Sequence, residues 1–171
     1  WSRGELVVLT GVPGMGKTTW LDYMYLRLAY KENWKFGIFS PENTAPLKIT
    51  RMAEQMMGMT MANQNEMQTN HALNFIDKHF FFFNIEEMND YNIDSILATA
   101  KMMVQRHGID CLCLDPFNYL EQEGSESAHE KIGLLLRKLK KFATVNDVNV
   151  TLVAHPRKME KTGNQYHVPR M

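Results

Sequence analysis

The sequence predicts an α/β fold with a mainly parallel sheet and helices on both faces. Short apolar runs rich in branched residues alternate along the chain with stretches of helical periodicity. The first apolar run leads directly into a glycine-rich loop and then into a helical pattern. This alternation implies right-handed crossover connections, which place helices on both sides of a parallel sheet. A length of 171 residues suits one domain.

The first half of the chain begins with two strand-helix pairs. Glu5–Thr10 is a branched apolar run of strand length, and Thr18–Tyr30 carries apolar side chains at helical spacing. Trp34–Ser40 predicts the second strand. A proline in its first turn and a glycine after its last residue predict a helix over about Ala45–Met57.

The middle of the chain is less regular. The methionine-rich stretch Met59–Gln68 is polar and predicts a loop, followed by a helix through Phe75 and Ile76. The aromatic run over about Phe80–Ile85 predicts the third strand.

The second half repeats the strand-helix alternation. Residues 92–108 carry apolar side chains at helical spacing and end at a glycine, which predicts a helix. Ile109–Asp115 predicts the fourth strand. Residues 126–145 predict the last helix, and Val148–His155 predicts the fifth strand.

Composition excludes several classes of protein. The chain has 19 Lys and Arg against 19 Asp and Glu, so a net charge of zero gives no support to a broadly basic nucleic-acid face. The basic run Arg137–Lys141 lies opposite an apolar helical face and is expected to be solvated. Cys111 and Cys113 would point the same way on one strand, which favours reduced thiols and an intracellular compartment. No apolar segment reaches the roughly 18 residues of a membrane helix.

The glycine-rich loop is the strongest functional signal. Residues 11–18 fit the phosphate-binding pattern G-x-x-x-x-G-K-[ST], between a predicted strand and a predicted helix. Backbone amides of such a loop and the positive end of the helix point at phosphates. Lys17 would reach the outer phosphates and Thr18 would ligate Mg²⁺. The expected nucleotide-binding residues are Gly11, Gly14, Met15, Gly16, Lys17, Thr18 and Thr19.

Two acidic residues follow predicted strands. Asp115 ends the fourth strand, where phosphate-loop enzymes carry the acid that holds Mg²⁺, although Asp115 could also be an ordinary turn residue before Pro116. Glu42 stands just past the second strand and could orient the attacking water, because ligands of open α/β sheets bind beyond the carboxyl ends of the strands. Glu42 could equally be a helix-start acid that complements the helix dipole.

The last candidates lie at the end of the fifth strand. His155 could contact the terminal phosphate, or it could be a satisfied polar residue at a strand end. Arg157, Lys158 and Lys161 follow it. They could contact the phosphates of a nucleic-acid strand or of a neighbouring subunit's nucleotide, or they could form a solvated surface.

Four motifs in order, "GELVVLTGVPGMGKTTWLDYM", "FGIFSPEN", "IDCLCLDPFNYL" and "VTLVAHPRK", resemble the RecA-type core of the hexameric replicative helicases. That group contains the bacterial DnaB helicases, phage primase-helicases and the mitochondrial Twinkle helicase. The resemblance spans nearly the whole chain, and the "HPRK" ending is more similar to the Twinkle and phage branch. It implies a RecA-like P-loop NTPase fold with strand order 3-2-4-5-1.

The resemblance also implies roles for residues. Lys17 and Thr18 match the nucleotide and magnesium residues, Glu42 the catalytic glutamate and Asp115 the magnesium aspartate. His155 matches the phosphate sensor.

Arg157 matches a basic residue of the DNA-binding loop. The implied cofactors are ATP or another NTP and Mg²⁺. The implied partners are single-stranded DNA, further copies of the chain in a homo-hexamer and a primase domain or partner, with no membrane.

The family pattern extends beyond this sequence. Residues 1–171 are therefore expected to be the RecA-like ATPase core of a longer chain, cut short at its C-terminal end and lacking a clear arginine finger.

Two other functions remain open: a recombinase-like or clock-protein-like assembly ATPase, and a small-molecule P-loop kinase. The expected location is the cytoplasm of a bacterium or a phage-infected cell, with the mitochondrial matrix or another organelle as the alternative.

Overall fold

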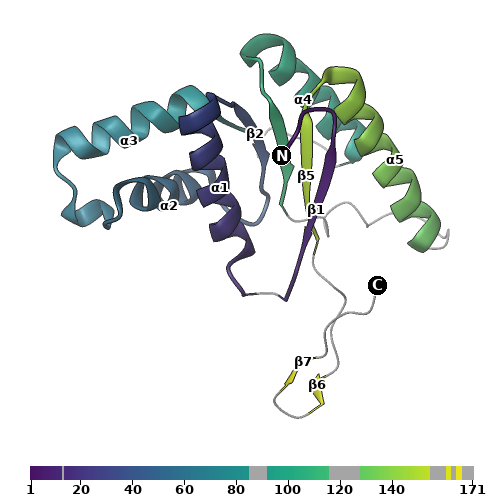
Figure 1. Ribbon diagram of the computed structural model, residues 1–171, viewed down its shortest axis with the longest axis horizontal. Coiled ribbons are helices and arrows are strands. Elements are labelled where there is room, and N and C mark those ends of the chain that lie inside the picture. The colour runs from purple at the N-terminus through teal and green to yellow at the C-terminus, as the bar shows by residue number, and fades with distance from the viewer. Residues whose placement is uncertain (13, 85–91, 116–127, 155–160, 163–164, 167–171) are drawn as a thin grey trace.

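A computed structural model of the chain describes residues 1–12, 14–84, 92–115, 128–154, 161–162 and 165–166. Five parallel strands form the central sheet in the order β1-β5-β4-β2-β3 (Figure 1). This order confirms the 3-2-4-5-1 arrangement that the resemblance implies. The strands are β1 (Leu6–Thr10), β2 (Phe36–Phe39), β3 (Phe80–Phe82), β4 (Cys111–Leu114) and β5 (Asn149–Ala154).

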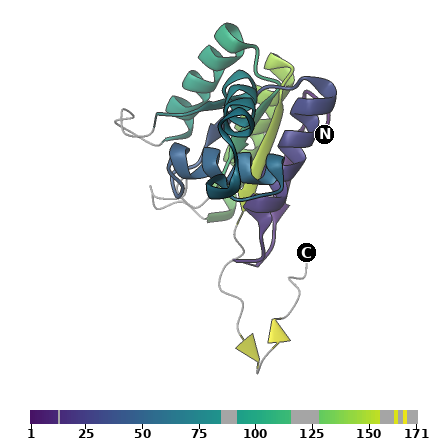
Figure 2. The same ribbon diagram turned by 90° about the vertical axis from the view of Figure 1, so that its left-hand side faces the viewer.

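Helices cover both faces of the sheet, as predicted (Figures 1 and 2). One face carries α1 (Lys17–Glu32), α2 (Ala45–Met57) and α3 (Glu66–His79), and the other carries α4 (Ile93–His107) and α5 (Ala128–Asn146). Because side chains alternate across a strand, each strand serves both cores. Cys111 and Cys113 face α1, whereas Leu112 and Leu114 face α4 and α5.

The elements differ from prediction mainly at their ends. Asn65 caps α3, because its side chain accepts a hydrogen bond from the Gln68 backbone N–H at 2.9 Å. The helix therefore starts at Glu66, and the predicted loop Met59–Gln68 was too long; it also contains the 3₁₀ turn η1 (Met61–Asn63).

Two further differences lie in the strands. β3 is assigned over three residues, and the predicted end at Ile85 lies outside the described residues. The antiparallel pair β6 (Lys161–Thr162) and β7 (Gln165–Tyr166) was not predicted, because two-residue strands leave no periodic signal.

Glycines end two of the helices where the sequence predicted them. Gly58 follows α2 with φ 68° and Gly108 follows α4 with φ 65°, both in the left-handed region. Among the described residues, no helix combines the length and apolarity that crossing a membrane would require.

Candidate active site

The phosphate-binding loop connects β1 to α1 at the carboxyl edge of the sheet. Gly14 and Gly16 have φ of 79° and 76°, and Gly16 is the N-cap of α1. A Cβ added at either position would meet no atom within 4 Å. Glycine is therefore favoured here by backbone conformation rather than by crowding.

Lys17 lies across this loop. Its ammonium donates hydrogen bonds to the carbonyl oxygens of Gly11 at 2.7 Å and Val12 at 3.1 Å. An ammonium group has three donors and no acceptor. Phosphate oxygens in the loop would compete with these carbonyls for the Lys17 donors.

Thr18 and Asp115 are in contact although they lie 97 residues apart in the sequence. The Thr18 hydroxyl donates a hydrogen bond to Asp115 Oδ2 at 2.9 Å. Asp115 is 3% exposed, and its backbone N–H donates to the carbonyl of Phe39 at 2.9 Å, which ties the end of β4 to β2. A hydroxyl and a carboxylate are hard oxygen donors of the kind that Mg²⁺ takes alongside substrate phosphates. These two residues fit the magnesium site that the sequence predicted.

Glu42 lies at the same edge of the sheet. β2 pairs with β4 so that Phe39 stands opposite Leu114, and Glu42 follows three residues after Phe39. Its side chain is exposed and helps to line a pocket of about 400 Å³ with Ser40 and Asn84. The topology therefore brings Glu42 and Asp115 to neighbouring strand ends.

Met15 and Thr19 lie in the glycine loop and the first turn of α1, as predicted, whereas the candidates after β5 cannot be placed in this site. His155, Arg157 and Lys158 lie outside the described residues. Lys161 begins β6, but its side chain is likewise outside what the structure describes.

Sequence reasoning missed a buried ion pair between α1 and α2. Lys48 Nζ lies 2.9 Å from Asp22 Oδ1, and the two residues are 2% and 3% exposed. Burial raises the pKa of Asp22, and the attraction of Lys48 only partly offsets this effect. A signal for this pair was present in the sequence. In each helix one charged residue lies on the apolar face, Asp22 next to Leu21 in α1 and Lys48 one turn before Met52 in α2.

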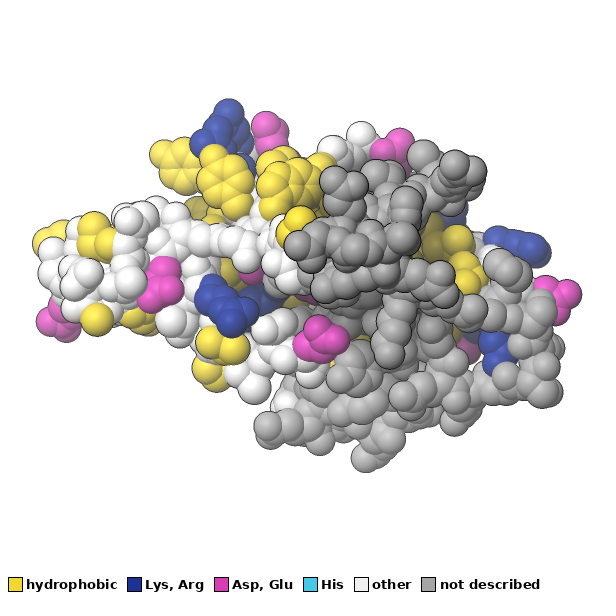
Figure 3. Space-filling model, turned by 90° about the horizontal axis from the view of Figure 1, so that it is seen from below, with side chains coloured by type: hydrophobic (Ala, Val, Ile, Leu, Met, Phe, Trp, Pro, Cys, Tyr) yellow, Lys and Arg dark blue, Asp and Glu magenta, His cyan; other side chains and the backbone are white. Residues whose placement is uncertain are grey.

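The surface at the carboxyl edge carries apolar side chains on its α1 side (Figure 3). Trp20 and Tyr23 on α1 are 46% and 49% exposed, and Trp1 packs against Trp20 with ring centroids 5.8 Å apart. Arg27 lies over the Tyr23 ring at 5.9 Å. Isolated basic side chains are scattered over this face, with no basic cluster among the described residues shown (Figure 3).

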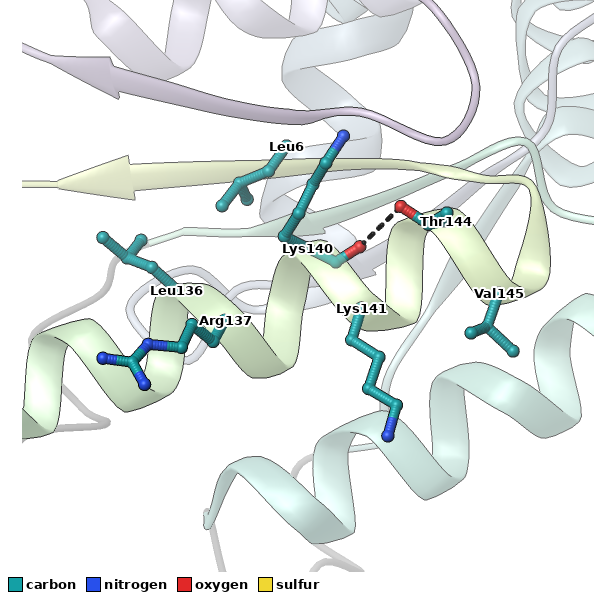
Figure 4. A pocket seen from close by; sticks show the side chains of 7 residues that line it. All are labelled: Leu6, Leu136, Arg137, Lys140, Lys141, Thr144 and Val145. Carbon is teal, nitrogen blue, oxygen red and sulfur yellow. Dashed lines mark hydrogen bonds between the residues drawn. The ribbon is translucent and has the colours of Figure 1, made fainter.

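A second, shallow groove of about 590 Å³ lies between α5 and β1, the strand at one border of the sheet (Figure 4). Leu6 and Leu136 form its apolar part, and Lys140 donates a hydrogen bond to the carbonyl of Gly4 at 2.8 Å. The basic residues of α5 that line it are exposed, which confirms the prediction of a solvated helix face.

Comparison with known proteins identifies the fold family. The family model for the DnaB-like helicase C terminal domain matches residues 1–170. The chain belongs to this family. Its parallel sheet with helices on both faces has the RecA-like fold that the sequence resemblance implied.

Two curated relatives of this helicase domain are similar in sequence. The Twinkle homolog protein, chloroplastic/mitochondrial, of Arabidopsis thaliana is 28% identical over 168 residues, covering 92% of the chain and 24% of that protein. The probable plasmid replicative DNA helicase of Chlamydia psittaci is 26% identical over 180 residues, covering 96% of the chain and 38% of that protein. The helicase domain thus spans about a quarter to two fifths of these relatives.

Solved structures share the fold of this helicase domain. One solved ATPase domain matches with a TM-score of 0.72 and 18% identity, covering 91% of the chain and 58% of the solved one. A DnaB-like replicative helicase, solved in a study of its interactions with primase, matches with a TM-score of 0.71 and 18% identity, covering 91% of the chain and 39% of the solved one.

Proposed function

We propose that this chain is the ATP-hydrolysing motor of a replicative DNA helicase, which translocates on single-stranded DNA and unwinds duplex. The observation that carries the proposal is the contact of Thr18 with Asp115 beside the glycine loop, within a chain of the DnaB-like helicase family. An assembly ATPase and a small-molecule kinase would also use a phosphate loop, but the family match favours the helicase.

Each residue of the site has a chemical role in this proposal. The amides around Gly14 and Gly16 and the start of α1 would hold the phosphates, and Lys17 would neutralise the outer ones. Thr18 and Asp115 would hold Mg²⁺, which supplies charge neutralisation on the phosphates. Glu42 would accept a proton from the attacking water, and its exposed carboxylate at the end of β2 supports that role.

The proposed partners follow from the same family. Single-stranded DNA would be contacted by the segment after β5, which holds Arg157, Lys158 and Lys161, and His155 would report the state of the terminal phosphate to it. We propose a homo-hexameric ring and a primase domain or partner in the complete protein. The compartment would be one with replicating DNA, either a bacterial or phage-infected cytoplasm or an organelle.

The test is the rate of ATP hydrolysis with and without single-stranded DNA, for the wild-type chain and for Glu42→Gln. We expect DNA to stimulate the wild-type rate about tenfold or more, and Glu42→Gln to lower turnover by about 100-fold or more, the range for loss of a general base. Nucleotide affinity should change little, because Glu42 would act on water rather than on the bound phosphates.

Three results would contradict the proposal. Turnover that survives Glu42→Gln would show that another base acts. An ATP hydrolysis rate that DNA does not change, together with no detectable DNA binding, would exclude the helicase function and favour the kinase. DNA-dependent assembly without unwinding would favour the assembly ATPase.

A further inference from the structure

The buried ion pair joins α1, which carries Lys17 and Thr18, to α2, which follows the segment that carries Glu42. Asp22 lies one turn after Thr18 on α1, so both side chains face the same side of that helix. Lys48 lies in the first turn of α2, the helix that follows the Glu42 segment, and its backbone N–H donates to the carbonyl of Thr44 at 3.1 Å. The pair therefore bridges the helix of the phosphate loop and the helix of the Glu42 segment.

The pair is almost completely buried. The Lys48 and Asp22 side chains are 3% and 4% exposed, and Lys48 Nζ lies 2.9 Å from Asp22 Oδ1. Burial lowers the pKa of Lys48, but Asp22 and the nearby Cys113 and Asp115 outweigh it, so its pKa is raised and the ammonium stays charged at neutral pH. A buried charge of this kind is held tightly to its partner, since separation would leave both unpaired.

A second contact joins the same helices further along. The Gln55 side-chain amide of α2 donates a hydrogen bond to the carbonyl of Thr19, in the first turn of α1, at 3.1 Å. The two contacts hold α2 against α1 at two points about two turns of α2 apart. Both contacts constrain the orientation of α2 relative to the start of α1.

We propose that Lys48 is a positioning residue for ATP hydrolysis: its buried ion pair with Asp22 sets the place of the Glu42 segment relative to the Thr18–Asp115 magnesium site. This inference rests on the proposed role of Glu42. Lys48 would not touch the nucleotide. Its loss would displace Glu42 from the attacking water while leaving the phosphate loop able to bind.

An ion pair here penalises separation of the two helices, because separation would leave two buried charges unpaired. A hydrophobic pair of similar volume could fill the same space and stabilise the fold as well or better. Apolar side chains would hold the helices by shape alone, whereas two opposite charges in an apolar surrounding also favour close contact. A displacement of about 1 Å in a catalytic group can lower the rate about 100-fold.

The experiment compares five variants of the chain with wild type. They are Lys48→Met, Asp22→Leu combined with Lys48→Met, Glu42→Gln, Glu42→Gln combined with Lys48→Met, and Lys138→Met. Lys138 serves as the matched control, because it forms an ion pair with Asp94 at 2.8 Å that is exposed and joins α5 to α4. The measurements are kcat for ATP hydrolysis, Kd for a fluorescent ADP analogue and the thermal unfolding midpoint.

We expect Lys48→Met to lower kcat by about 10- to 100-fold while Kd changes less than about threefold. The variant that lacks both charges should recover the unfolding midpoint without recovering kcat, because it removes the unpaired charge but not the loss of positioning. Lys138→Met should change neither kcat nor Kd. Combining Lys48→Met with Glu42→Gln should give no further loss beyond Glu42→Gln alone, since both act on the same step.

Several results would overturn the inference. Recovery of kcat together with stability in the variant that lacks both charges would make the pair purely structural, and multiplicative losses in the Lys48→Met and Glu42→Gln combination would separate Lys48 from Glu42. Turnover that survives Glu42→Gln would instead refute the role of Glu42, and the inference with it. Turnover that depends on Glu42 but not on Lys48 would refute the inference alone.

Discussion

At the scale of single residues, the site combines exposed and buried ionisable groups within one edge of the sheet. Glu42 is exposed, whereas Asp115, Asp22 and Lys48 are at most 3% exposed. Exposure suits a residue that must exchange protons with water, and burial suits residues that hold a fixed geometry. Burial also acts on Cys111, a free thiol at the start of β4 that is 0% exposed.

The two buried thiols predict a loss of stability at high pH. Burial raises the pKa of Cys111 from 9.0 to about 12 and raises that of Cys113 well above its ordinary value. Between these values the unfolded thiol loses its proton and the folded thiol keeps it, so the free energy of unfolding should fall as pH rises above 9.0, by up to about 1.4 kcal/mol per pH unit for each thiol. Urea unfolding at a series of alkaline pH values would measure this slope.

The control replaces both cysteines with alanine. Because Tyr25 is also buried with its pKa raised by burial, part of the alkaline slope should persist in that variant. An identical slope with and without the thiols would contradict the prediction.

At the scale of elements, local signals determine where helices begin and end. Asn65 and Gln68 form a reciprocal capping box at the start of α3, with the Asn65 N–H donating to Gln68 Oε1 at 3.0 Å. Thr44 precedes α2 as its N-cap but makes no side-chain capping bond. The two helices therefore offer a capped and an uncapped start within one protein.

Asn65→Ala should lower the free energy of unfolding by about 1 kcal/mol, because the Gln68 N–H loses its acceptor. Thr44→Ala, the matched control, should cost clearly less, since no capping bond is lost. Equal losses would mean that backbone preference rather than the side-chain bond accounts for the cap. Denaturant unfolding with a constant m-value would measure both variants.

At the scale of the whole molecule, two separate cores on opposite faces of the sheet hold the strand ends in register. The α5 side is built on Leu139 and Phe142 with Leu112 and Leu114 of β4. The α1 side is built on Leu21 of α1 with Cys111 and Cys113 of β4. Both cores must form for β4 to present Asp115 at its end.

Leu139→Ala should lower the free energy of unfolding by about 2–5 kcal/mol, because Leu139 is 0% exposed and its removal leaves a cavity. Leu134→Ala on the same helix should change it by less than about 0.5 kcal/mol, since Leu134 is 50% exposed. A small effect at Leu139 would mean that α5 contributes little to the core. Both values come from urea unfolding monitored by circular dichroism.

Elements of secondary structure were easier to predict from the sequence than contacts between distant residues. The five strands of the central sheet and the helices α1 to α5 were predictable, because apolar periodicity is a local property of the sequence. The motif likewise placed Lys17 and Thr18 after the glycine loop, and their roles with Asp115 stay predictions. The start of α3 was predicted too late, although Asn65 followed three residues later by Gln68 is a capping-box pattern that marks a helix start. The Lys48–Asp22 pair was not predicted, because its two members come from different helices.

Local patterns in the sequence specify the alternation of strands and helices and the position of the phosphate-binding loop. Which distant residues come into contact depends on how the strands and helices pack. The contact of Thr18 with Asp115 depends on β4 lying two strands from β1, and the contact of Lys48 with Asp22 depends on α1 and α2 sharing one face. Pairing between distant segments is set by the burial of both sheet faces at once, and that condition involves the whole chain.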